Sequence, residues 1–276
     1  MNRVVLTGTG VPVPDPQRAG AGTLVELDGV RLQVDAGRGT VLRLAGSGTP
    51  LPSLDAVLLT HHHSDHLTGL ADLVLSRWLA GGHRTRIVAP AGPAARFAER
   101  VLDPWQDDVA VRIEHAGHGG PPAVDVTAFE PAKQPVEVAR FGDVLVTAVS
   151  VHHEPVLPAV AYRIDGPTGS VVVSGDTRVC SEVEALAAGA DVLVHEVRLR
   201  AFAAAARGTR FEAIAEYHAD AVDLGAAAQR ARVRRLVLTH FIPPPRDGFK
   251  PFIDEVRSGG FTGELVAGDD LTAVSW

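Results

Sequence analysis

The sequence predicts an α/β protein in which two mixed β-sheets pack face to face, with helices on the outside. Three observations support this fold class. Runs with strand-like alternation and runs with helical spacing follow one another in both halves of the chain. No linker or low-complexity tract separates the halves. The 276 residues, 46% of them hydrophobic, can bury a large core. We therefore expect a single domain over residues 1–276.

The first half begins with a strand at 4–7 and a loop rich in proline and glycine that ends at Gly22. Two alternating runs, 23–27 and 30–34, are joined by Asp28-Gly29 and predict a β-hairpin. The elements that follow are a turn at 35–39, a helix at 40–45, a strand at 55–59, a helix at 66–79, a strand at 86–89 and a helix at 92–101.

The pattern loosens in the segment 102–140. Proline, glycine and acidic residues separate two short strand-like runs, at 109–113 and 124–129. Irregular segments of this length are typical of binding loops and insertions. We expect a variable insertion or a lid here.

The second half again alternates strands with helices. Its predicted elements are strands at 144–151, 159–164 and 170–174, a helix at 179–188, a strand at 191–195, an Ala-rich helical stretch at 199–217, a helix at 218–231, a strand at 235–239, a helix at 250–257, and strands at 261–267 and 271–275. The same alternation in both halves is the reason for predicting two sheets of mixed direction.

Composition narrows the class of protein. The net charge of −7 and the scattered basic residues indicate no electrostatic surface for nucleic acid. Cys180 is the single cysteine, so an intrachain disulfide is excluded and a reducing cytoplasm fits. The N-terminus lacks the apolar run of a signal peptide, and no run reaches membrane-spanning length. We expect a cytoplasmic protein without a membrane partner.

A histidine-rich turn, residues 60–66, lies between the strand at 55–59 and the following helix. Because residues alternate sides as an extended chain leaves its strand, His61 and His63 can point the same way. Asp65 and His66 then fall in the first turn of the helix. Imidazole nitrogen and carboxylate oxygen are the ligands that zinc and similar ions accept. The turn therefore predicts a metal site.

Further donors follow other strands at the point where each strand ends. His152-His153 comes after 144–151, Asp176 after 170–174, and His240 after 235–239. Open α/β folds place their sites along this edge of the sheet. We expect these side chains to converge on the histidine-rich turn.

The string His61-x-His63-x-Asp65-His66 resembles the signature of the metallo-β-lactamase-fold hydrolases. The similarity extends over nearly the whole chain, and the segments 6–10, 35–39 and 267–271 are most similar to the ribonuclease Z and arylsulfatase-like branch. This resemblance implies a four-layer αββα sandwich, the metallo-β-lactamase fold, with a binuclear metal site.

The resemblance also implies a ligand set. One ion would be held by His61, His63 and His153, the other by Asp65, His66 and His240, with Asp176 bridging both. We prefer His153 to His152 because the family's ligand is followed closely by a proline, and Pro155 stands two residues on. The expected cofactors are two divalent transition-metal ions, zinc first, with manganese and iron as alternatives.

Two weaker motifs belong to the same branch. Residues 194–197 resemble its His-Glu-Ala-Thr motif, and residues 217–220 its His-Ser-Thr motif; both depart at their last positions, so only His195, Glu196 and His218 carry over. In the implied chemistry, Asp65 orients the nucleophile and His218, oriented by Glu196, protonates the departing oxygen. The catalytic residues we predict are Asp65, His218 and Glu196.

We predict an enzyme, a hydrolase that uses a metal-bound hydroxide on phosphodiester or sulfate esters of small molecules. The alternatives are a ribonuclease Z-type tRNA 3′ endonuclease and a lactone or carboxylate ester hydrolase. The fold also hosts mononuclear-iron dioxygenases and diiron electron-transfer modules, but His66 and His240 favour two metals.

Small substrates are preferred for two reasons. The segment 102–140 is acidic rather than basic, and Phe241-Ile-Pro-Pro-Pro245 replaces the family's Ser-x-Arg-Tyr continuation. We therefore do not expect nucleic acid as a partner, and a homodimer remains open. His83, His115 and His118 are expected on surface loops.

Overall fold

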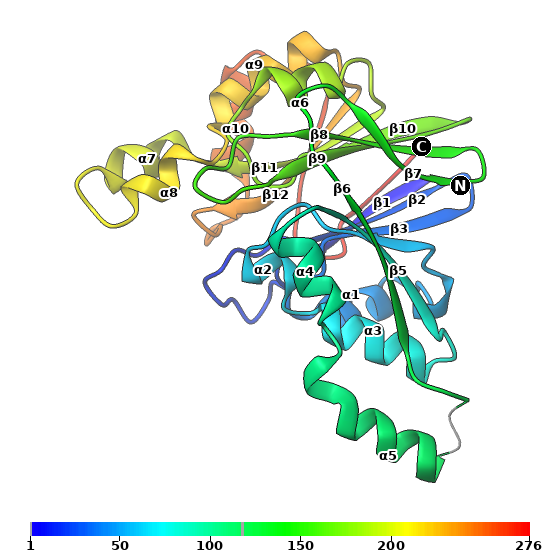
Figure 1. The fold of residues 1–276 in the computed structure, drawn as a ribbon. Helices are drawn as coiled ribbons and strands as arrows, with labels where there is room; N and C mark the ends of the chain where they lie inside the picture. The colour runs from blue at the N-terminus through cyan, green and yellow to red at the C-terminus, as the bar shows by residue number, and fades with distance from the viewer. Residues whose placement is uncertain (1, 117–118) are drawn as a thin grey trace.

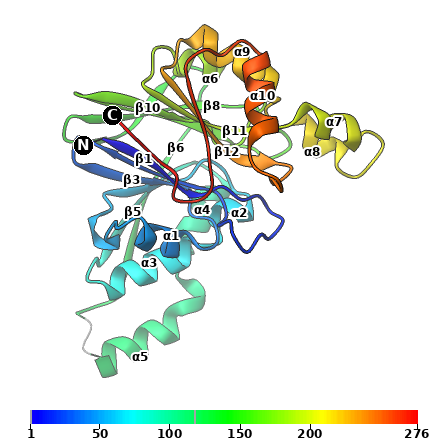
Figure 2. The same cartoon turned by 180° about the vertical axis from the view of Figure 1, so that it is seen from behind.

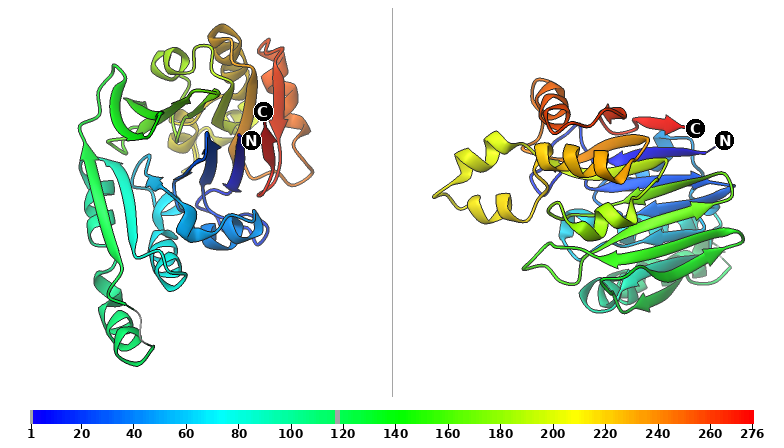
Figure 3. Two further views of the ribbon diagram at one scale, coloured as in Figure 1. Left: turned by 90° about the vertical axis from the view of Figure 1, so that its right-hand side faces the viewer. Right: turned by 90° about the horizontal axis from the view of Figure 1, so that it is seen from above.

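The computed structural model describes residues 2–116 and 119–276, so His118 lies outside the described residues. Within these ranges, two seven-stranded sheets lie face to face, and helices cover their outer sides (Figures 1 and 3). The predicted fold class is thereby confirmed.

The first sheet has the order β14-β1-β2-β3-β4-β5-β6. Asp28 and Gly29 both adopt positive φ, 52° and 84°, which is the turn that the β2–β3 hairpin requires. The strands are β1 (Arg3–Gly8), β2 (Gly22–Leu27), β3 (Val30–Val34), β4 (Ala56–Leu58), β5 (Arg84–Pro90), β6 (Ala123–Phe129) and β14 (Ala273–Ser275).

The second sheet has the order β13-β12-β11-β10-β9-β8-β7. Strands β10 to β13 run parallel, so the ends of β10, β11 and β12 meet at one edge. The strands are β7 (Val136–Phe141), β8 (Val144–Ser150), β9 (Val160–Gly166), β10 (Gly169–Val173), β11 (Val192–Arg198), β12 (Arg235–Ile242) and β13 (Glu264–Ala267).

An aliphatic core fills the space between the sheets. Its members are mostly valine and leucine at alternate positions of both sheets, for example Val25 and Val34 from one and Val171 and Val194 from the other. Tyr162 is buried within this core, and its hydroxyl donates to the carbonyl of Leu59 at 2.7 Å. This bond ties the second sheet to the residue just before the histidine-rich turn.

Helices cover the outer face of each sheet (Figures 1 and 2). The apolar faces of α1, α3 and α4 pack on the first sheet, and those of α6, α9 and α10 on the second. Their bounds are α1 (Thr40–Gly46), α3 (Leu70–Leu79), α4 (Pro93–Glu99), α6 (Ser181–Leu186), α9 (Ala221–Ala231) and α10 (Lys250–Ser258); the short helices η1 (Leu51–Ser53) and α2 (Ser64–Leu67) stand between elements of the first half.

The helix predicted at 66–79 is two helices, α2 and α3, that part at Thr68-Gly69. Gly69 packs against the backbone of Gly37, where an added Cβ would lie 2.1 Å from the carbonyl oxygen. This close approach brings the turn after β3 against the turn that carries the histidines. The continuous helical spacing of the apolar residues did not reveal the break.

The segment 102–140 differs from its prediction. After η2 (Asp103–Trp105), the run 109–113, predicted as strand-like, lies in helix α5 (Gln106–Ala116), which projects from the body (Figure 1). Acidic residues begin α5, and Asp108 pairs with Arg112 at 2.8 Å, four residues on, so charge favours the helix where alternation was ambiguous. The rest supplies β6 and β7, an edge strand of each sheet.

A second projection consists of α7 (Arg200–Ala206) and α8 (Glu212–Glu216), which together correspond to the Ala-rich helical stretch. It extends beyond the ends of β11 and β12, opposite the chain termini (Figure 1). None of the helices within 2–116 and 119–276 has the length and apolarity that a membrane crossing requires.

Candidate metal centre

The first donor cluster consists of His61, His63, His153 and Asp176. Each offers one ligand atom, and these atoms all lie within 4.8 Å of one another. His153 Nε2 lies 3.2 Å from His63 Nδ1 and 3.9 Å from Asp176 Oδ2. His62 belongs to neither cluster, in agreement with the alternation expected for the turn.

His152, the competing residue, points elsewhere. Its Nδ1 lies 3.1 Å from Glu154 Oε1, and its Nε2 lies 3.5 Å from Glu182 Oε1. The His153 side chain, in contrast, is fully buried among the other donors. The structure therefore brings His153, and not His152, to the cluster.

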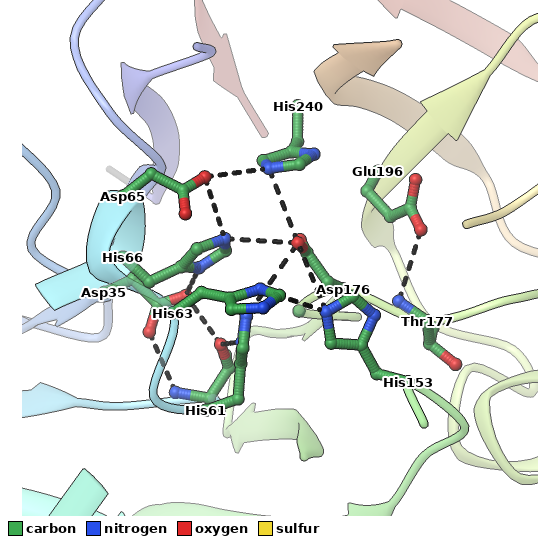
Figure 4. A network of polar contacts seen from close by, with 12 residues as sticks. Asp35, His61, His63, Asp65, His66, His153, Asp176, Thr177, Glu196 and His240 are labelled. Atoms are coloured by element: carbon green, nitrogen blue, oxygen red, sulfur yellow. Dashed lines mark hydrogen bonds and ion pairs between the residues drawn. The ribbon is translucent and has the colours of Figure 1, made fainter. Parts of the chain in front are cut away.

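The second donor cluster consists of Asp65, His66 and His240. Asp176 stands between the two clusters, because its Oδ2 lies 3.3 Å from His66 Nε2, 3.4 Å from His240 Nε2 and 3.9 Å from His61 Nε2 (Figure 4). The position is the one that a bridging carboxylate needs. Of the seven predicted donors, four come from the first sheet's histidine-rich turn and three from strand ends of the second sheet. His218 offers a further ligand atom within 4.8 Å of those of Asp176 and His240.

A β-bulge aims His240 at the centre. The pairing of β11 with β12 joins Glu196 to Thr239 and Val197 to Phe241, and passes over His240, whose φ is 44°. Leu238 faces the outer helices, so simple alternation would place the His240 side chain on that outer face and the Phe241 side chain on the inner face. With the extra residue, Phe241 packs on the outer side and His240 joins the donors.

Buried charge sets the protonation of the donors. Burial alone would raise the pKa of Asp176, but the charges of His240 and His66 hold it well below its ordinary value. Burial lowers the pKa of His66, yet Asp176 and Asp35 outweigh it, and that pKa lies well above the ordinary value. The low pKa of Asp176 thus depends on the positive charge beside it, which a bound cation can also supply.

The residues present fit a metal. His61 Nε2 and Asp65 Oδ1 are buried and have no hydrogen-bond partner among the described residues. Orphaned polar atoms of this kind are costly in a protein interior unless an ion or water satisfies them. Imidazole and carboxylate donors at these separations match the preferences of borderline divalent ions such as zinc.

Asp35 supports the second cluster and was missed as a site residue. Its carboxylate accepts from the Thr60 backbone N–H at 2.8 Å, from the Thr60 hydroxyl at 2.7 Å and from His66 Nδ1 at 2.7 Å (Figure 4). These bonds fix the ring of His66 and leave its Nε2 facing Asp176. The signal was available, because Asp35 directly follows a strand, as the predicted donors do.

Replacing Asp35 with asparagine should weaken metal affinity by about 10- to 100-fold, the usual cost of losing a carboxylate that orients a ligand histidine. Competition with a chromogenic chelator measures this affinity. Asp28→Asn is the matched control, because Asp28 also has positive φ but lies in the β2–β3 hairpin. An unchanged affinity in Asp35→Asn would remove Asp35 from the centre's supports.

Glu196 and His218 form a buried pair beside the second cluster. Glu196 Oε1 accepts from His218 Nδ1 at 3.0 Å, from the Ala219 backbone N–H at 2.9 Å and from that of Thr177 at 3.2 Å. The His218 ring stacks on that of His240, with centroids 5.5 Å apart and planes 22° apart. The arrangement matches the pairing expected from the sequence.

His195 does not reach the centre. Its side chain lies on the opposite face of β11, with Cys180 in a small cavity under α6 and α9, and its Nδ1 donates to the Glu196 carbonyl at 2.7 Å. The side-chain contacts of His195 among the described residues therefore indicate a packing role.

An ion pair between Asp220 and Arg198 helps to hold the segment that carries His218. The helix predicted from 218 begins at Ala221, because Asp220 is its N-cap and accepts from the Val222 backbone N–H. Asp220 Oδ2 also lies 3.4 Å from Arg198 Nη2, and the Arg198 backbone N–H donates to the Ala219 carbonyl at 2.7 Å. The end of β11 is thus fastened to the segment that carries His218.

Comparison with known proteins shows similarity over the whole chain. Residues 31–241 match the family described as Beta-lactamase superfamily domain. The ribonuclease Z of Mycolicibacterium paratuberculosis is 38% identical over 278 residues, which cover 99% of this chain and 98% of that protein.

Solved structures agree in fold. The metallo-β-lactamase fold protein YhfI from Bacillus subtilis superposes with a TM-score of 0.75 at 21% identity, and the short form of human tRNase Z with 0.71 at 20%. Each comparison covers 99% of this chain and 98% of the other.

The expected partner was wrong. We expected a small-molecule substrate and no nucleic acid, whereas the relative that shares 38% of its residues is named as a ribonuclease. The expectation rested on the net charge, on the acidic segment 102–140, and on the replacement of the family's Ser-x-Arg-Tyr continuation by Phe241-Ile-Pro-Pro-Pro245. Net charge averages over the whole surface and says little about one binding face. Part of that segment forms edge strands rather than a binding arm.

Proposed function

The chain belongs to the beta-lactamase superfamily and is a ribonuclease Z homologue, and on that basis we propose that it is a metal-dependent endonuclease that cleaves a phosphodiester at the 3′ end of a precursor tRNA. The observation that carries the proposal is the position of Asp176 Oδ2 between two clusters of donors, beside the Glu196–His218 pair. We take the whole chain to act as one hydrolase domain.

We propose two divalent transition-metal ions, with zinc expected. One ion would be held by His61, His63 and His153, and the other by Asp65, His66 and His240. Asp176 would bind both ions. When bound, such a pair lowers the pKa of a water molecule and neutralises charge on a phosphoryl group. The support is the donor set itself, all histidine and aspartate.

Asp65 is suited to orient the attacking water and to take its proton. Its Oδ2 lies 3.2 Å from His240 Nε2, while its buried Oδ1 has no hydrogen-bond partner among the described residues. The contact at Oδ2 fixes the carboxylate, and the unsatisfied Oδ1 can accept a hydrogen bond from the nucleophile.

His218 is suited to serve the departing oxygen. Glu196 binds its Nδ1, so Nε2 is the nitrogen left for a substrate. The hydrogen bond to the carboxylate fixes the tautomer and the plane of the ring.

The test is cleavage of a transcribed precursor tRNA that carries a 3′ trailer. The zinc-loaded protein should cut it at one position and leave the mature tRNA intact, and a chelator should abolish the reaction until zinc is restored. Bis-p-nitrophenyl phosphate and p-nitrophenyl sulfate are assayed in parallel. Hydrolysis of these esters with an intact precursor would overturn the proposal.

A further inference from the structure

Tyr217 lies beside the first donor cluster and the Glu196–His218 pair. Its ring centroid is 5.0 Å from that of His153, edge to face at 87°, and 5.0 Å from that of His218 at 50°. It therefore contacts a donor of the first cluster and the proposed proton donor at the same time. A group leaving toward His218 would pass beside this ring.

The ring is not a core side chain. Tyr217 is partly exposed and belongs to none of the three buried apolar clusters. Among the residues that the structure describes, its ring contacts are those with His153 and His218, and no hydrogen bond of its hydroxyl is found. The ring therefore packs against these two histidines and leaves part of its surface exposed.

Its backbone has a separate role. The Tyr217 carbonyl accepts from His153 Nδ1 at 3.3 Å, and so helps to fix the ring of that donor. Any residue at this position can supply the carbonyl. The side chain can therefore be changed without removing the contact that orients His153.

We propose that Tyr217 is a stacking platform for the nucleobase of the nucleotide that carries the departing oxygen, an inference that rests on the proposed function. His218 Nε2 marks where that oxygen lies, and the adjoining ring is where its nucleoside reaches the protein. Partly exposed aromatic rings bind single-stranded nucleotides through the face of any base. The subsite thus recognises a base by stacking, with little preference for its identity.

The test is direct binding to the zinc-loaded protein, measured by calorimetry. The ligands are a single-stranded tetraadenylate with hydroxyls at both ends and two analogues, each without one terminal base. In the wild type, loss of one of the two terminal bases should weaken binding by about 5- to 150-fold, the span of base–aromatic stacking. Tyr217→Phe should keep this preference, and Tyr217→Ala should bind all three ligands equally.

Metal content separates stacking from a structural role. It should be unchanged in Tyr217→Ala, because the carbonyl that accepts from His153 is retained. A Tyr217→Ala protein that keeps the base preference, or that loses its metal, would overturn the proposal.

The same proteins are assayed on the precursor tRNA, which tells the two proposals apart. If binding depends on the base and on Tyr217 but the precursor is not cut, the proposed function fails and the subsite stands. If the precursor is cut equally well by Tyr217→Ala and binding ignores the base, the subsite fails and the function stands.

Discussion

Replacing His153 with alanine should remove bound metal and lower the rate of phosphodiester cleavage by about 10³-fold or more, whereas His152→Ala should change neither. His153 lies among the donors, 3.9 Å from Asp176 Oδ2, while the neighbouring imidazole faces Glu154 and Glu182. Losing several kcal/mol of metal-derived stabilisation corresponds to a rate loss of this size. The two variants carry the same His→Ala change at adjacent positions, so they have the same amino-acid composition.

Elemental analysis of the purified proteins gives the metal content, and kcat/KM on bis-p-nitrophenyl phosphate gives the rate. The wild type should carry close to two ions per chain. Asp176→Asn alters the residue that is proposed to bind both ions. It should lose at least as much metal and activity as His153→Ala. A folded His153→Ala protein with full metal and activity would show that the cluster is not the metal centre.

Replacing His218 with alanine should leave the metal content intact and slow the reaction by about 10²- to 10⁴-fold on a substrate with a poor leaving group, the usual span of general acid catalysis. Esters of p-nitrophenol depart with little help, so the same variant should lose far less on them. Glu196→Gln should show a weaker version of the pattern, because Glu196 orients the ring through a 3.0 Å bond and does not meet the substrate.

The measurement is kcat/KM against the pKa of the leaving group, for the wild type and both variants. His218→Ala should give the steeper line. Parallel lines would remove His218 from the catalytic residues, and so would loss of metal in that variant.

Much of the centre could be predicted because its donors obey one simple rule, that polar side chains follow buried strands. The rule located the histidine-rich turn, Asp176 and His240 on three separate strands. The hairpin at Asp28-Gly29 could be predicted for a different reason, because a local turn preference decides its structure. The choice between His152 and His153 needed more, since both follow the same strand and only the family's spacing to Pro155 favoured one of them.

The remaining features depend on contacts between distant segments. The break at Gly69 comes from the backbone of Gly37, and the inward turn of His240 comes from a bulge against β11. The run 109–113 is too short for periodicity to separate strand from helix, whereas the acidic residues of the first turn and the Asp108–Arg112 pair favour the helix. Asp35 also directly follows a buried strand, but the sequence predicts it as part of the turn at 35–39 and not of the site.

The origin of the donors has a consequence for stability. Because four come from the first sheet and three from the second, a metal bound by this set would join the sheets at the edge where their strands end. Metal binding and the packing of one sheet on the other would then be thermodynamically linked, and the linkage would be reciprocal. We therefore expect a substitution in the inter-sheet core that loosens this packing to lower metal affinity from a distance, and a chelator to act on this protein as a mild denaturant.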